Sequence, residues 1–212
     1  MAGNKRQLFL KVGERLFSRY GYRDVSIEDI AREAGVGTGS FYTYFSAKEV
    51  FYEEILDSLE QKGIQEVDRL VAGFDSPMSR LKAVYRFATL GIRKNPILLG
   101  ILTGNRKYTY PGQEERLEGG RTLRQHVERV IADIIRDGED RRLLRTRPFR
   151  DPTALLVALY DAILMNLDSL KIEELMNDAL QLAERGLKRR IRLRPAPRAR
   201  SGRRRREPES PA

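Results

Sequence analysis

Apolar residues recur every three or four positions along most of this chain, the spacing that places them on one face of an amphipathic helix. Near the N-terminus this spacing predicts a helix over about residues 5–20 and two short helices, at about 27–34 and 38–44. The longer helices predicted after them cover about residues 47–72, 77–93, 96–103, 114–137, 152–169 and 172–190. The chain is therefore predicted to be all-α, with about nine helices.

Three of the predicted helices begin in the same way, with a capping residue followed directly by proline. Ser76-Pro77, Asn95-Pro96 and Asp151-Pro152 each supply a side-chain acceptor at the N-cap. Proline at the first helical position gives up no intrahelical hydrogen bond. The segments over residues 104–113 and 138–150 are predicted to be loops.

Residues 26–49 contain two short helices joined by a tight turn. Ser26 is placed to cap the first of them, and Asp29, three positions on, completes a partial capping box. Gly35 is predicted to end this helix, because glycine reaches the left-handed conformation at no steric cost. Val36 then packs back under the turn. Two short helices joined through a glycine turn are typical of a helix-turn-helix unit.

The second short helix consists mostly of residues that form helices poorly. Only Phe41 and Phe45, four positions apart, are predicted to anchor it to a core. Small and hydroxyl-bearing side chains suit a helix that approaches DNA, since they let the backbone near the phosphates and donate to phosphates or base edges. The predicted contacts are Thr38, Gly39, Ser40, Tyr42, Thr43 and Tyr44. The alternative is an exposed, frayed loop.

The helix predicted from residue 47 begins with Ser46-Ala47-Lys48-Glu49, which has the pattern of a full capping box. Lys48 lies in the first turn, where the backbone N–H groups favour an anion. We predict that Lys48 helps to hold a DNA phosphate there, and that Ser26 contacts a flanking phosphate. The alternative for Lys48 is an ordinary surface lysine.

Residues 9–51 resemble the TetR family of transcriptional regulators, the tetracycline-repressor-like proteins. The resemblance rests on Phe17 with Gly21-Tyr22, on Ile30-Ala31 and Ala34-Gly35-Val36, and on Phe41-Tyr42 with Phe45 and Lys48. Gly37 departs from the family, in which Ser or Thr is common at this position. The departure leaves the second short helix with a weak cap.

The resemblance implies a DNA-binding domain over residues 1–48 and an effector-binding and dimerisation domain over residues 49–190. It also implies a homodimer that binds double-stranded DNA at a palindromic operator, as a ligand-responsive repressor. Two recognition helices would then enter successive major grooves about 34 to 36 Å apart. The helix over residues 47–72 would link the two domains, so that its tilt sets the separation of the two recognition helices.

The helix predicted over residues 152–169 is apolar nearly all round, so it must bury two faces. Alanines in this helix and in the last one permit close helix approach, and two such helices from each subunit would make a four-helix dimer interface. The residues predicted at this interface are Ala154, Ala158, Ala162, Met165, Met176, Ala179, Ala183 and Leu187. The alternative is one large core within a monomer.

The family resemblance also implies a small-molecule pocket between helices of the larger domain. The predicted wall residues are Phe87, Leu90, Ile101, Tyr108, Tyr110, Val127, Ile131 and Tyr160. The polar hydroxyls of residues 107–110 are expected to gate an entrance. A mostly apolar lining indicates a hydrophobic or amphipathic effector.

The formal net charge of +10 is concentrated at the C-terminus. Residues 188–212 carry eleven Lys or Arg and two Glu, a local charge of +9 that leaves +1 for residues 1–187. Residues 191–212 are predicted to be a disordered Arg-rich tail, since they bury too little apolar surface to fold. Because such a tail attracts phosphates without regard to sequence, the alternative function is a non-specific architectural DNA-binding protein.

An enzyme is not indicated. His126 is the only histidine, so a multi-histidine metal site is not possible, and a histidine-based triad is not expected. No phosphate loop or dinucleotide motif is present. No cofactor or metal is predicted. The chain has no cysteine, no signal peptide and no transmembrane segment, which together lead us to expect a cytoplasmic protein with no membrane partner.

Overall fold

The computed structural model describes residues 2–113, 122–147, 149–167 and 171–187, and its regular elements are all helical. The predicted all-α fold is confirmed. The segment predicted to bind DNA forms α1 (Ala2–Tyr20), α2 (Ile27–Glu33) and α3 (Thr38–Tyr42). The long α4 (Lys48–Ala72) follows it. The remaining elements are α5 (Pro77–Arg86), η1 (Phe87–Gly91), η2 (Ile92–Lys94), α6 (Pro96–Leu102), α8 (Thr122–Asp140), α9 (Pro152–Met165) and α10 (Ile172–Leu187).

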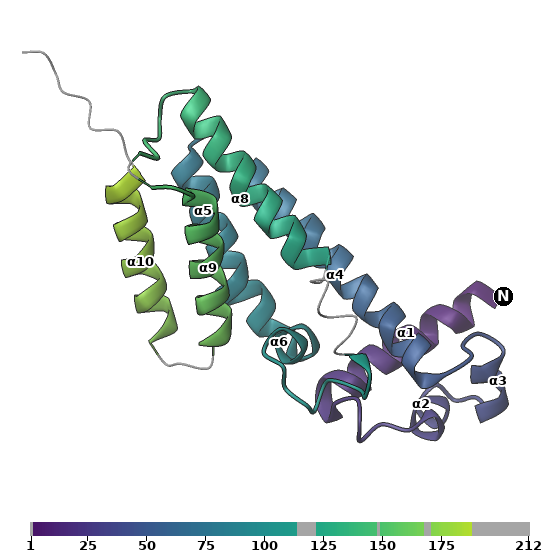
Figure 1. Cartoon of the computed structure of the whole chain (residues 1–212). Helices are drawn as coiled ribbons and strands as arrows, with labels where there is room; N and C mark the ends of the chain where they lie inside the picture. Colours follow the sequence, from purple (N-terminus) through teal and green to yellow (C-terminus); the bar gives the residue numbers. More distant parts are fainter. Residues whose placement is uncertain (1, 114–121, 148, 168–170, 188–212) are drawn as a thin grey trace, which may run out of the picture.

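The molecule is elongated, and α4 runs along most of its length (Figure 1). Helices α1 to α3 gather around the first turns of α4, whereas α5 and α8 pack along its second half. Helices α9 and α10 lie side by side at the far end (Figure 1). Because α4 touches both ends, it joins them. The division of the chain at residues 48 and 49 stays a prediction.

An aromatic cluster forms the core around the start of α4. The Phe51 ring lies 5.1 Å from Phe41 and 4.6 Å from Phe45, and Phe9 of α1 meets Phe41 edge-on at 5.7 Å. All four rings are buried. Edge-to-face packing of this kind stabilises the core beyond the burial of apolar area, and it fixes the angle between elements. The first turn and a half of α4 is therefore part of the core that holds α1 to α3.

Two predicted capping boxes had different outcomes. At the start of α2, the Asp29 N–H donates to the Ser26 hydroxyl at 3.0 Å and the Ser26 N–H donates to the Asp29 carboxylate at 3.0 Å, which confirms the first box. The second box, predicted from Ser46 to Glu49, was wrong, because Ala47 is the N-cap of α4 and no side chain caps it. The Glu49 carboxylate instead accepts a hydrogen bond from the Tyr22 hydroxyl at 2.5 Å.

The single helix predicted over residues 77–93 is three segments. α5 gives way to a π-helix, η1, and then to a short 3-10 helix, η2. Within η1 the Thr89 hydroxyl donates to the carbonyl groups of Tyr85 and Arg86, at 3.5 and 3.3 Å. A side chain that bonds back in this way competes with the regular backbone ladder. Apolar spacing did not show this change of helix type.

Helix α8 continues past Gly138, where the sequence predicted its end. Gly138 is buried, and a Cβ there would lie 2.4 Å from Leu144. The glycine is therefore needed for close packing and not for a turn. The chain turns later, at Arg142, which has a φ of 55°. The start predicted for this helix, residues 114–121, lies outside the described residues, as do the predicted tail and the predicted helix end at residues 188–190.

Among the described residues, no helix is both long enough and apolar enough to cross a membrane.

Candidate nucleic-acid interface

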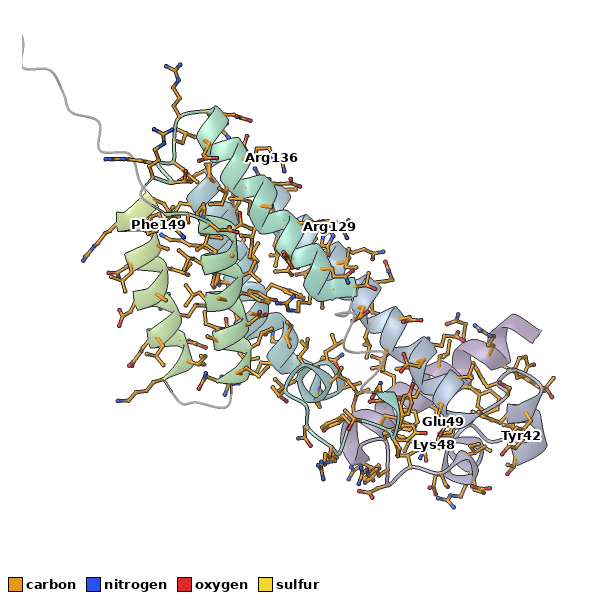
Figure 2. All side chains as sticks on the ribbon, in the orientation of Figure 1. Tyr42, Lys48, Glu49, Arg129, Arg136 and Phe149 are labelled. Atoms are coloured by element: carbon orange, nitrogen blue, oxygen red, sulfur yellow. The ribbon has the colours of Figure 1, made fainter. Side chains whose placement is uncertain are left out.

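Helix α3 buries one face and exposes the other. Phe41 is completely buried on the inner side, whereas Tyr42 is 55% exposed on the outer side (Figure 2). Gly39 and Thr43 are also exposed, and Thr38, Ser40 and Tyr44 are half-buried. The outer surface of α3 therefore consists of the small and hydroxyl-bearing residues that the sequence predicted as DNA contacts. The contacts themselves stay predictions.

The turn before α3 has the geometry expected of a helix-turn-helix. Gly35 has a φ of +69°, in the left-handed region that favours glycine, and a Cβ there would meet no atom within 4 Å. The glycine is therefore needed for its backbone conformation alone. The Val36 N–H donates to the Ala31 carbonyl at 3.0 Å, which closes the turn. Gly37 is the N-cap of α3 and makes no side-chain hydrogen bond, in line with the weak cap predicted there.

Ser26 is already occupied by its capping role. Its hydroxyl accepts from the Asp29 N–H and donates to the Asp29 carboxylate at 2.6 Å. These hydrogen bonds from Ser26 lower the pKa of Asp29, and Arg32 pairs with the same carboxylate. A DNA phosphate at Ser26 would therefore compete with the capping hydrogen bonds and with a nearby negative charge.

Lys48 is held in place by aromatic packing. Its Nζ lies 4.2 Å from the centroid of the Tyr22 ring, a cation–π contact. Partial burial lowers the pKa of the Lys48 ammonium, and the Tyr22 hydrogen bond lowers the pKa of the neighbouring Glu49 carboxyl. Both side chains lie at the start of α4, at the same end of the molecule as Tyr42 (Figure 2). Lys48 is thus positioned before any ligand binds.

The loop over residues 104–113 contacts the helix-turn-helix end of the molecule. The Tyr22 N–H donates to the Lys107 carbonyl at 2.8 Å, and the Tyr52 hydroxyl donates to the Tyr108 carbonyl at 2.7 Å. The Tyr108 hydroxyl donates in turn to the Ser18 carbonyl at 3.3 Å. The sequence placed this loop at a pocket entrance, but it bridges the C-terminal end of α1 and the first turns of α4.

Glu53 anchors the same loop. The Tyr110 hydroxyl and the Gln113 amide each donate to Oε1 of Glu53, at 2.9 Å. Glu53 is only 8% exposed, so its carboxylate is buried in this contact. Tyr108 and Tyr110, predicted in the wall of an effector pocket, are buried in this contact instead. Sequence reasoning missed Glu53; an acid within the apolar spacing of α4 was its one available signal.

The other residues predicted to line the pocket do not lie at one site. Ile101, Val127, Ile131 and Tyr160 are buried in the core, and only Phe87 and Leu90 line a groove, of about 1040 Å³. The groove lies between α4, the α5–η2 segment and α10. Charged side chains also line it, which the sequence did not predict: Glu66, Lys82, Arg86, Lys94 and Glu173.

The predicted dimer interface is exposed on α9 but needs correction on α10. Ala154, Ala158, Ala162 and Met165 form an exposed stripe along α9. Met176 and Leu187 are buried inside the chain, because they belong to the inner face of α10, and Ala179 and Ala183 are half-buried. The exposed apolar residues of α10 are Leu175 and Leu182, which the sequence analysis left out.

Comparison with known proteins gives a family model and a related protein sequence. Residues 9–55 match the family model described as bacterial regulatory proteins, tetR family. The HTH-type transcriptional regulator YhgD of Bacillus subtilis (strain 168) is 27% identical over 142 residues, which cover 65% of this chain and 73% of that protein.

Two solved structures share the fold. A TetR transcription regulator from Haloarcula marismortui has a TM-score of 0.71 at 20% identity and covers 88% of this chain and 100% of its own. A transcriptional regulator from Saccharomonospora viridis, solved in complex with choline, has a TM-score of 0.70 at 18% identity and covers 89% of this chain and 100% of its own.

Proposed function

This chain belongs to the TetR family and is a DNA-binding transcriptional regulator, and we propose that it is a ligand-responsive repressor which binds a palindromic operator as a homodimer. The observation that carries the proposal is the outer face of α3, where Gly39, Tyr42 and Thr43 are exposed over a buried Phe41. A helix that is anchored on one side and small and hydroxyl-rich on the other fits a major groove.

The proposed division of labour on this surface follows from side-chain chemistry. Lys48, positioned on the Tyr22 ring at the start of α4, would contact a phosphate and so fix the orientation of the protein on DNA. The remaining contacts would come from α3 and the residues just after it, of which Thr43 is the proposed base contact: Thr38, Gly39, Ser40, Tyr42, Thr43 and Tyr44. Ser26 keeps a place in the proposal only as a flanking contact.

The proposed dimer is supported by an apolar surface that the described part of the chain leaves uncovered. Leu155 and Met165 of α9 are 56% and 63% exposed, and Leu175 and Leu182 of α10 are 55% and 69% exposed. Large exposed apolar groups that cluster on adjacent helices mark interaction surfaces. The exposed alanines of α9 let a second copy approach closely, because the distance between packed helices depends on the size of the side chains at the contact. A two-fold interface of this kind matches a palindromic operator.

The proposed response to an effector relies on α4 and on the loop over residues 104–113. Both connect the larger domain to the helix-turn-helix end, the loop through Tyr22 and Glu53. An effector that favours one tilt of α4 would change the separation of the two α3 helices. Its influence is limited to the difference between its affinities for the two arrangements. The choline-bound relative supports a small-molecule effector in this fold but not its identity. Such a regulator would act in the cytoplasm, where it can reach the genome.

The direct test is selection from random duplex DNA with protein that ends at Arg190, compared with the full-length chain. One enriched palindromic motif, shared by both proteins, is the expected result. Enrichment of no motif by the shorter protein, with binding restored only by residues 191–212, would instead favour the architectural alternative. That alternative is kept because of the +9 charge of residues 188–212.

A further inference from the structure

The groove between α4 and α10 is built from side chains four residues apart. Leu70 of α4 and Phe74, which follows that helix, contribute one row, and Arg86, Leu90 and Lys94 contribute a second row from the end of α5 to η2. Phe74 and Leu90 are 48% and 41% exposed, so each presents a large apolar side chain to the groove. The groove therefore has an apolar floor that no other described segment covers.

The contacts of α10 fix what lies opposite the second row. Lys82 pairs with Glu184 at 2.8 Å, and the Thr89 hydroxyl lies 3.6 Å from the sulfur of Met176. These two contacts show that α10 runs antiparallel to the row. Arg86, which lies between Lys82 and Thr89, therefore faces the middle of α10. The groove-lining residues of that part are Asn177, Leu180 and Gln181.

The ion pairs among the described residues leave Arg86 and Lys94 as the available cations of the groove. Lys82 is neutralised by Glu184, and the Glu66 carboxylate is held by Arg69 through hydrogen bonds of 2.8 and 2.6 Å. In the described part of the chain Arg86 belongs to no ion pair. The antiparallel packing of α10 places its first-turn acid, Glu173, toward the end of the groove at Lys94 and away from Arg86.

The groove also stays open in the proposed dimer. The residues of α10 that line it are Glu173, Met176, Asn177, Leu180 and Gln181. Leu175 and Leu182, proposed at the dimer interface, point from the opposite side of the same helix, because residues one or two positions away are turned by about 100° or 200°. The π-helix η1, which lies between α5 and η2 in the chain, forms part of the groove wall. π-Helices are frequent at functional sites.

We propose that this groove binds an anionic amphipath, a carboxylate on an alkyl chain, with the carboxylate on Arg86 and the chain over Leu70, Phe74 and Leu90. A guanidinium binds a carboxylate through two parallel hydrogen bonds, and the amides of Asn177 and Gln181 supply further polar partners at the same level of the groove. The alkyl chain covers the exposed apolar floor.

The regulatory part of this inference rests on the proposed function. The occupant would touch α4, which leads to the DNA-binding end, and α10, which lies at the proposed dimer interface. By filling the space between these two helices it would favour one tilt of α4. Binding itself does not depend on that outcome and is measured without DNA.

The test uses the full-length protein and three probes that share a ten-carbon chain, decanoate, decanol and decyltrimethylammonium, in isothermal titration calorimetry. The two ionic probes are kept below their micellar concentrations and decanol below its solubility limit. Decanoate should bind most tightly. The variant Arg86→Gln should weaken decanoate by about tenfold or more, to the level of decanol. Arg93→Gln, the same change at an exposed arginine that does not line the groove, should leave all three affinities unchanged.

Two further variants separate the two halves of the site. Arg86→Glu should reverse the preference toward decyltrimethylammonium, and Leu90→Gln should weaken decanoate and decanol alike. Equal affinities for the three probes, or an unchanged decanoate affinity in Arg86→Gln, would overturn the proposal. A change in self-association caused by Arg86→Gln would overturn it as well, because it would show that a second copy occupies the groove. Failure to select an operator would count against the proposed function and leave these binding results standing.

Discussion

The ammonium of Lys48 lies 4.2 Å from the centroid of the Tyr22 ring, so the cation predicted to meet a DNA phosphate is fixed on the core of the helix-turn-helix. Tyr22 is itself held from two directions. Its hydroxyl donates to Glu49, and its backbone N–H donates to Lys107 in the loop over residues 104–113. The proposed phosphate contact is therefore linked to the larger domain by one residue.

Replacing Lys48 with alanine should weaken binding to every DNA sequence by a similar factor, because a phosphate contact carries no base information. The slope of log affinity against log salt should fall by about one. Affinity measured by fluorescence anisotropy over a range of salt concentrations tests both points. Lys62→Ala, a loss of the same charge farther along α4, is the matched control. If the two variants behave alike, Lys48 has no special role.

Thr43→Ala should change the base preference at one position of each half-site. Thr43 is exposed at the end of α3. Its hydroxyl donates one long hydrogen bond, of 3.4 Å, to the Gly39 carbonyl, so its removal should cost little stability. A lost base contact costs about 1 to 3 kcal/mol of discrimination. The DNA selection is repeated with this variant and with the control Thr122→Ala, at an exposed threonine of α8, and the two selected motifs are compared. An unaltered motif from the Thr43 variant would remove it as a base contact.

Tyr110→Phe should destabilise the protein by about 1 to 3 kcal/mol, because the buried carboxylate of Glu53 would lose a donor. Urea denaturation gives the free energy of unfolding. Tyr20→Phe, the same change at an exposed tyrosine, serves as the control and should have little effect. Faster amide hydrogen exchange across the loop over residues 104–113 should accompany the loss. Equal stabilities of the two variants would mean that Glu53 does not anchor the loop.

Replacing Tyr85 or Tyr160 with phenylalanine should have opposite effects on the free energy of unfolding. The Tyr85 hydroxyl donates to the Leu156 carbonyl at 2.6 Å, whereas the Tyr160 hydroxyl is buried with no hydrogen-bond partner among the described residues. Burial raises the pKa of both phenols, so both stay neutral near pH 7. Tyr85→Phe should lower the free energy of unfolding by about 1 kcal/mol, and Tyr160→Phe should raise it by up to about 1 kcal/mol. A loss of stability in Tyr160→Phe would show that its hydroxyl has a partner.

Leu182→Arg should dissociate the proposed dimer. This side chain is 69% exposed on α10, and a charge there would be buried without a partner in a four-helix interface. Sedimentation equilibrium should give the mass of a monomer for the variant and of a dimer for the parent protein. Leu143→Arg, at another exposed leucine, should remain dimeric. Identical masses for all three proteins would place the interface elsewhere.

The local features of the fold were predictable from the sequence, since they depend on residues close together in the chain. The Ser26–Asp29 capping box and the Gly35 turn are examples, and both depend on backbone groups within a few positions. The Ser46–Glu49 box failed because Glu49 has a stronger competitor in Tyr22, 27 residues away. A local pattern contains no information about such a partner.

The larger domain was less predictable for the same reason. The contact between Glu53 and Tyr110 joins residues 57 positions apart, and nothing near either residue indicates it. On α10, apolar residues lie on two sides of the helix, and spacing alone did not tell which side faces inward. Met176 is buried whereas its neighbour Leu175 is exposed, so at this point the exposed apolar side of α10 differs from the prediction by one residue.

The central claim is that two copies of α3 read one operator from a fixed separation, and half-site spacing tests it most directly. Once an operator has been selected, duplexes with about 5 or about 10 extra base pairs between its half-sites can be compared by fluorescence anisotropy. The account predicts loss of high-affinity binding for the half-turn insertion, because one α3 would then face the wrong side of the duplex. Equal affinity for the original and the half-turn duplex would contradict it.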